Sequence, residues 1–89
     1  MHRVVKVEPR AGFRLHVRFA DGVEGEVDLS GRLFGPMFEP LRNGDFFRQV
    51  AIDEFGVVCW PNGADLAPDA LHARLEAGGR PGDALRGPG

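Results

Sequence analysis

The chain has 89 residues, which is enough for one domain, since independent domains usually run from about 50 to 200 residues. Hydrophobic residues make up 43% and charged residues 27%, a composition typical of an ordinary soluble globular chain and not of a disordered one. The formal net charge of −2 gives the chain as a whole no attraction to nucleic acid or to an anionic membrane. A domain this small has little room for a deep, dry cavity, so we expect a protein that is not an enzyme.

Two segments near the N-terminus, residues 13–19 and 23–29, alternate apolar and polar side chains, as strands with one buried face do. Residues 20–22 join them. A two-residue turn would place apolar residues of one strand opposite polar residues of the other. A three-residue loop, with its glycine in the left-handed conformation, sets Arg18 opposite Glu24 and keeps both faces consistent. The pattern therefore predicts an antiparallel hairpin.

An upstream strand, residues 4–9, extends this hairpin into a meander. Its connection, residues 10–12, again ends in glycine, and we expect the two strands to pair through a three-residue loop. The expected pairs are Val7 with Leu15, Val5 with Val17, and Glu8 with Arg14.

A second hairpin is predicted downstream, where residues 50–53 and 57–60 flank a third loop of the same type. This arrangement places Ile52 opposite Val58 and Cys59 opposite Ala51.

Two helical elements complete the chain. Asp45 can cap a short helical turn over residues 46–49. Residues 68–78 predict a helix, because a proline and an aspartate open it and a glycine suits its C-terminal cap.

These elements predict a single α+β domain over residues 1–76. It consists of an antiparallel meander of three strands, a second hairpin, a short helical turn and a C-terminal helix packed on the sheet. Residues 77–89 carry five Gly and two Pro without periodic apolar positions, and we predict a flexible tail there.

A reducing cytoplasm is the expected location. A single Cys cannot form an internal disulfide, the chain does not open with a secretory signal pattern, and no apolar stretch is long enough to cross a membrane. The first strand or the fourth could present a free edge to a second copy, so a homo-oligomer is one expected assembly.

Basic residues concentrate in the first three predicted strands. Lys6, Arg14 and Arg18 project from one face, and an arginine-bearing sheet can follow phosphates, which makes nucleic-acid binding an alternative function. Acidic residues lie in the same cross-strand rows, so the local charge is close to neutral. We therefore rank nucleic acid below a protein partner.

No catalytic or metal-binding pattern stands out. His2, His16 and His72 are far apart in the sequence, and Cys59 has no second cysteine at ligand spacing. In mid-strand Cys59 reads as a small core residue rather than a nucleophile. We expect no catalytic residue, metal or cofactor.

An irregular apolar segment, residues 33–38, allows two interpretations. It can fold over the sheet and complete the core of a small domain. Alternatively, its side chains Phe34, Met37 and Phe38 can form a surface patch that binds a partner.

The motif Trp60-Pro61-Asn62-Gly63-Ala64-Asp65-Leu66, followed by Pro68-Asp69-Ala70-Leu71, resembles the signature of the bacterial domain-of-unknown-function family 2442. Earlier elements agree in order, from Arg3 to the strand ending at Phe19 and the Asp21-Gly22 turn, and the resemblance covers about residues 3–75. It implies a small α+β protein without an established activity. It also implies a component of a toxin–antitoxin pair.

The motif can also be explained structurally. Trp60 would cover the sheet, Pro61 would end strand pairing, Asn62 and Gly63 would form a turn, and Asp65 would bond backbone N–H groups at the helix start. Asn62 and Asp65 are its best candidates for polar contact with a partner. The sequence thus favours a protein-interaction or regulatory module, such as the antitoxin-like partner of a small toxin.

Overall fold

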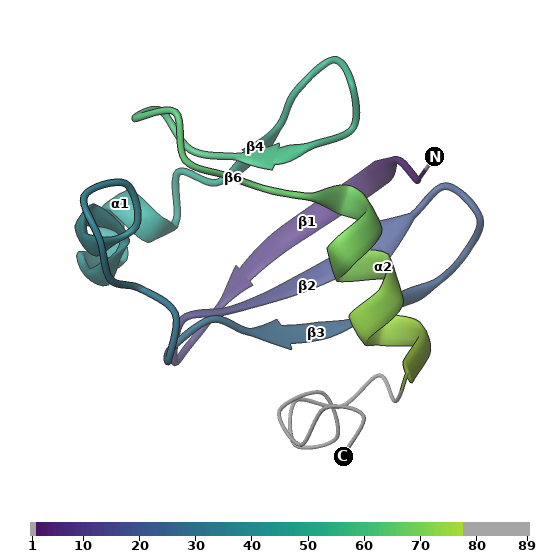
Figure 1. Ribbon diagram of the computed structural model, residues 1–89, viewed down its shortest axis with the longest axis horizontal. Coiled ribbons are helices and arrows are strands. Elements are labelled where there is room, and N and C mark those ends of the chain that lie inside the picture. Colours follow the sequence, from purple (N-terminus) through teal and green to yellow (C-terminus); the bar gives the residue numbers. More distant parts are fainter. Residues whose placement is uncertain (1, 78–89) are drawn as a thin grey trace.

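The computed structural model describes residues 2–77 and contains two antiparallel sheets of three strands each (Figure 1). The first sheet consists of β1 (Val4–Arg10), β2 (Arg14–Phe19) and β3 (Glu24–Asp28). The second consists of β4 (Ala51–Ile52), β5 (Val58–Cys59) and β6 (Asp65–Leu66). Between the sheets along the chain lie a 3₁₀ turn, η1 (Glu39–Arg42), and α1 (Gly44–Phe47), and the helix α2 (Pro68–Ala77) follows β6.

The predicted α+β fold, with its meander, second hairpin, helical turn and C-terminal helix, is confirmed. The second sheet has one strand more than expected, because β6 pairs with β5 and sets Leu66 opposite Val58. The predicted tail, residues 77–89, lies outside the described residues except for Ala77.

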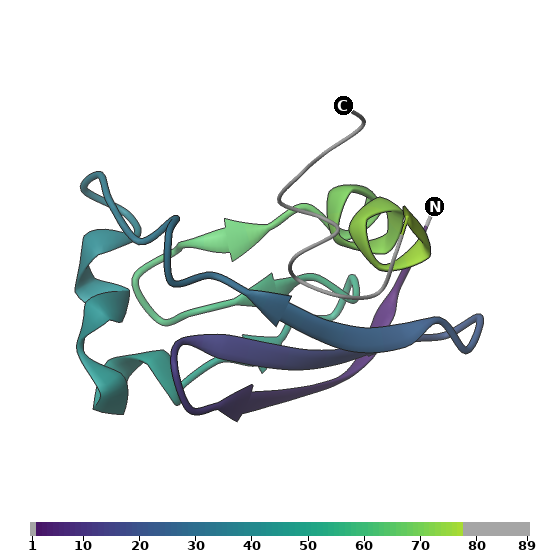
Figure 2. The ribbon, with the colours of Figure 1, turned by 90° about the horizontal axis from the view of Figure 1, so that it is seen from below.

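The core lies between the first sheet on one side and α2 and the second sheet on the other. Figures 1 and 2 show α2 crossing one face of the first sheet near β2 and β3. Side chains from every layer are buried there, including Leu15 and Val17 of β2, Val58 of β5 and Leu71 of α2. The opposite face of the first sheet carries the charged side chains. The alternation seen in the sequence therefore divides a buried face from a wet one.

The registers predicted for two hairpins are confirmed. Arg18 lies opposite Glu24, and Gly22 adopts the left-handed conformation at φ 93°, which suits glycine because it lacks Cβ. In the second hairpin Ile52 lies opposite Val58.

The register predicted between the first two strands is wrong by two residues. Val7 lies opposite Val17, because the loop consists of residues 11–13 instead of 10–12. Phe13 takes a left-handed φ of 59°, and its ring packs edge-on against Phe47 with centroids 5.4 Å apart. This aromatic contact stabilises a conformation that sequence rules assign to glycine. A two-residue shift leaves every side chain on its predicted face.

The first helical turn begins earlier than predicted. Asn43, not Asp45, caps α1, and its Oδ1 accepts hydrogen bonds from the N–H groups of Asp45 and Phe46. A neutral amide oxygen thus satisfies donors that the helix leaves unpaired.

Trp60 joins the second sheet to α1. Its indole Nε1–H donates to the carbonyl oxygen of Phe47 at 2.9 Å, and the side chain is 3% exposed. The two rings pack with centroids 5.9 Å apart. The backbone N–H of Trp60 also donates to Ala64, closing the turn that leads into β6. The motif tryptophan is therefore a core residue with a satisfied polar group.

Trp60→Ala should lower the free energy of unfolding by about 3–5 kcal/mol, because it leaves a cavity and removes the indole donor. Trp60→Phe keeps much of the apolar volume and isolates the loss of the hydrogen bond, so its effect should be smaller. Chemical denaturation followed by circular dichroism measures both. An unchanged stability in Trp60→Ala would contradict this role.

His72 holds α2 to the β2–β3 turn. It is 2% exposed, and it is the one polar side chain that is buried among residues 2–77. Nε2 lies 2.7 Å from Asp21 Oδ2, and Nδ1 lies 3.1 Å from Glu76 Oε1. His2 stacks on the ring, and its backbone N–H donates to Asp69 Oδ1. Each ring nitrogen thus faces a carboxylate oxygen, an arrangement that favours the protonated, cationic ring.

The charges of this contact predict a pH dependence. Burial lowers the pKa of His72, but the hydrogen bond and charge of Asp21, together with Glu76, raise it overall. The bond from the Val23 N–H and the bond from His72 lower the pKa of Asp21. The raised pKa of His72 stabilises the fold below its unfolded value of about 6.5, and the lowered pKa of Asp21 stabilises it above about 3.9. The contribution is full between these values and is lost as pH rises through the folded pKa of His72.

Asp21→Asn should therefore destabilise the protein most at about pH 5.5, and less as the pH rises through the folded pKa of His72. Asparagine keeps the Oδ1 acceptor for the Val23 N–H but cannot pair with a charged imidazole. Melting temperatures of the variant and the parent protein, compared across this range, measure the effect. A difference in melting temperature that stays constant with pH would show that the charges of His72 and Asp21 contribute nothing to stability.

Candidate partner-binding groove

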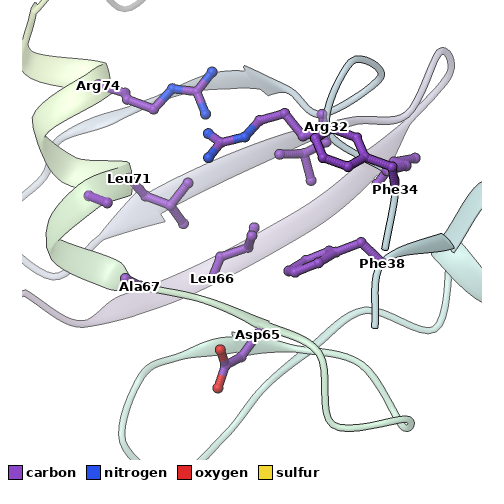
Figure 3. A pocket seen from close by; sticks show the side chains of 11 residues that line it. Arg32, Phe34, Phe38, Asp65, Leu66, Ala67, Leu71 and Arg74 are labelled. Atoms are coloured by element: carbon purple, nitrogen blue, oxygen red, sulfur yellow. The ribbon is translucent and has the colours of Figure 1, made fainter. Parts of the chain in front are cut away.

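A groove of about 360 Å³ opens between α2, β6 and the segment that follows β3 (Figure 3). Its lining is mainly apolar, with charged groups at the edges. The lining residues are Leu29, Arg32, Leu33, Phe34, Phe38, Asp65, Leu66, Ala67, Ala70, Leu71 and Arg74. The volume is that of a few side chains, and pockets of this size bind small molecules or short segments of a partner.

Two arginines make one end of the groove positive. In Figure 3 the guanidinium groups of Arg32 and Arg74 extend toward each other from the loop and from α2. Burial first, and the nearby charge of Arg32 second, lower the pKa of Arg74 against the opposing effect of Asp28. Within residues 2–77 neither arginine belongs to an ion pair. Two adjacent cations without a paired carboxylate favour an anionic ligand.

The wall opposite α2 comes from the irregular segment 33–38. Leu33 is 3% exposed and belongs to the core, whereas Phe34 is 65% exposed. Phe38 is half-buried and packs against the core, and Met37 is 44% exposed. The segment therefore contributes to the core through Leu33 and to the surface through Phe34 and Met37.

Asn62 fixes this wall to the turn between β5 and β6. Its Nδ2–H donates to the carbonyl oxygen of Met37 at 2.9 Å, and its Oδ1 accepts from the Ala64 N–H at 3.1 Å. From the other side, Arg42 Nε donates to the carbonyl oxygen of Leu33 at 2.6 Å. Two side chains thus hold the backbone of a segment that has no regular structure of its own.

The other residues of the Trp60 to Leu66 motif lie in different surroundings. Pro61 and Gly63 are exposed in the turn, and Gly63 has a left-handed φ of 93°. Asp65 was expected to bond N–H groups at the helix start, but it lies in β6 opposite Cys59. It lines the groove at the end away from the arginines (Figure 3). The groove therefore brings together Phe34, Phe38 and Asp65 of the predicted partner-binding residues, while Met37 and Asn62 support its wall.

The basic face of the first sheet has the expected three residues, and the corrected register adds Arg10 to them. Each basic residue has an acidic neighbour. Glu8 lies 3.4 Å from Lys6 and 2.9 Å from Arg10, Glu26 lies 3.4 Å from Arg14, and Glu24 lies opposite Arg18. His16 also lies 2.7 Å from Glu24. The mixed charges leave little net positive potential on this face.

Cys59 is poorly suited to act as a nucleophile. Burial, followed by the charges of Asp53 and Asp65, raises the pKa of its thiol, and a raised pKa disfavours the reactive thiolate.

No helix in the described part of the chain is long and apolar enough to cross a membrane.

Sequence reasoning missed Arg32 and Arg74. The two residues are 42 positions apart, and each alone reads as a solvated side chain. The spacing of Leu71, Arg74 and Leu75 offers the only signal, since it places an arginine beside the buried face of the predicted helix. The proximity of Arg74 to Arg32 depends on how the irregular segment folds back toward α2.

The fold and groove define a small α+β domain that presents a mainly apolar groove, positively charged at one end, beside its C-terminal helix. The chain belongs to the family described as protein of unknown function (DUF2442), whose model matches residues 4–77. The family expected from the Trp60 to Leu66 motif is thereby confirmed. Searches of the curated proteins and of the solved structures gave no significant match.

The anchor at Asn62 predicts a local effect. Asn62→Asp keeps the oxygen that accepts from Ala64 but removes the donor to Met37, so the segment 33–38 should open more often. Limited proteolysis should cleave this segment several times faster while the melting temperature changes little. Asn62→Ala removes both bonds and should also lower the melting temperature. Unchanged cleavage in Asn62→Asp would contradict the anchor.

Proposed function

We propose that this protein is a non-enzymatic interaction module whose groove binds a short segment of a partner protein. The segment carries a carboxylate next to a large apolar side chain. The observation that supports this most strongly is the pair Arg32 and Arg74 beside an apolar lining that includes the exposed ring of Phe34. An arginine pair binds carboxylate oxygens through several N–H donors, and the apolar lining provides area for a hydrophobic side chain.

The charge distribution favours a peptide over a nucleic acid. Asp65 lies at the end of the groove away from the arginines, so a continuous polyanion along the groove would meet its carboxylate. A segment with a single acidic group avoids this repulsion. The alternative, nucleic-acid binding through Lys6, Arg14 and Arg18, has less support because acidic residues share their face.

An antitoxin-like role is one form of this proposal. It requires a stoichiometric complex in which this chain covers an acidic and apolar segment of a small toxin. The groove supplies a surface of suitable chemistry for such a partner.

A display library of short random peptides, selected on the immobilised protein, tests the proposal. We expect enrichment of sequences with Asp or Glu next to Phe, Leu or Ile. Binding of a selected peptide should fall at least tenfold in Arg74→Glu and in Arg32→Glu, because each reverses the charge that the carboxylate meets. It should also weaken in Phe34→Ser.

Arg18→Glu is the matched control, since it reverses an arginine on the other face of the first sheet. It should leave peptide affinity unchanged. Absence of any enriched motif, or equal binding by Arg74→Glu and the parent protein, would refute the proposal. Salt-sensitive binding of nucleic acid that is lost in Arg18→Glu would support the alternative instead.

A further inference from the structure

Three residues with metal-ligating side chains meet at one end of the first sheet. His2 precedes β1, Asp21 lies in the β2–β3 turn, and His72 lies in α2. Each offers one ligand atom, and these atoms lie within 4.8 Å of one another. The distance between the histidines in the sequence led us to expect no metal site. The fold nevertheless brings the two histidines together in space, because α2 returns the chain to the N-terminal end of β1.

We propose that His2, Asp21 and His72 bind a divalent transition-metal ion, with Zn²⁺ as the probe. Two imidazoles and one carboxylate are a donor set that suits Zn²⁺ and neighbouring metals, and water completes the coordination. None of the three residues lines the groove, so this site is independent of the proposed function.

The neighbours of His72 orient its ring as the neighbours of a metal-bound histidine usually do. Glu76 Oε1 lies 3.1 Å from Nδ1, which leaves Nε2 as the ligating nitrogen and fixes the orientation of the ring. The ring of Phe19 packs edge-on against His72 with centroids 4.9 Å apart, and Phe19 is 1% exposed. An oriented imidazole beside a buried apolar wall is held in place before an ion arrives.

Binding replaces a proton with the ion. His72 Nε2 releases its proton to solvent, and the lone pair left on Nε2 then bonds to the metal. Nε2 and Asp21 Oδ2 now lie 2.7 Å apart, whereas two ligands of a tetrahedral Zn²⁺ lie roughly 3.3 Å apart. The Asp21 side chain is 48% exposed and can move outward by this amount.

His2 must rotate to complete the site. Its ring lies parallel to that of His72, with an interplanar angle of 7° and centroids 3.6 Å apart. Nitrogen lone pairs lie in the plane of each ring, so two parallel rings cannot both point at one ion. His2 is half-buried, and rotation of its side chain gives up its stacking on His72 and its edge contact with Phe19 but moves no fully buried residue.

Thermal unfolding of the full-length, untagged chain with and without excess Zn²⁺ tests the site. Near pH 7.5, Zn²⁺ should raise the melting temperature by about 5 °C or more, because the ion binds only the folded arrangement. The increase should disappear in His2→Ala and in Asp21→Asn. His72 is not substituted, since its loss would also disturb the core.

His16→Ala is the matched control, because His16 pairs with Glu24 outside the cluster, and it should keep the full Zn²⁺ effect. Visible d–d absorption of Co²⁺ should appear in the parent protein and in His16→Ala, and should be absent from His2→Ala. No thermal effect of Zn²⁺ on the parent protein would overturn the proposal. An equal effect on His2→Ala would overturn it as well.

Discussion

The buried bond from the Trp60 indole to the Phe47 carbonyl is the contact on which the arrangement of the second sheet depends. The strands of that sheet are two residues long, and pairing this short cannot hold its position alone. The indole crosses from the end of β5 to the end of α1 and places a large ring in the core on the way. Breaking the bond would leave the buried indole N–H without an acceptor, whereas the Phe47 carbonyl would still accept from the Val50 N–H.

The shape of the groove depends on this hydrogen bond. Two residues after Trp60, the amide of Asn62 holds the backbone of Met37, so the position of the tryptophan sets the position of the wall that carries Phe34 and Phe38. The opposite wall is α2, which His72 holds to the β2–β3 turn. A family motif that reads as structural thus determines the shape of a surface that can bind a partner.

Much of the fold could be predicted because alternation and three-residue glycine loops are local signals. The β2–β3 register followed from Arg18 facing Glu24. The β1 register could not be predicted, since Phe13 adopts a left-handed conformation that its tertiary contact with Phe47 supports. The two-residue strand β6 has no periodicity to detect. The groove and the histidine cluster arise from residues far apart in the sequence, and only tertiary packing brings them together.

Hydrogen exchange of the Trp60 indole N–H tests the central role of this contact most directly. The chain contains one tryptophan, so a single indole resonance reports on the bond. If the second sheet depends on it, this proton exchanges only through global unfolding, with the same free energy as the most protected backbone amides of β2. Exchange through a local opening of much lower free energy would contradict the account, because the sheet would then persist without its anchor.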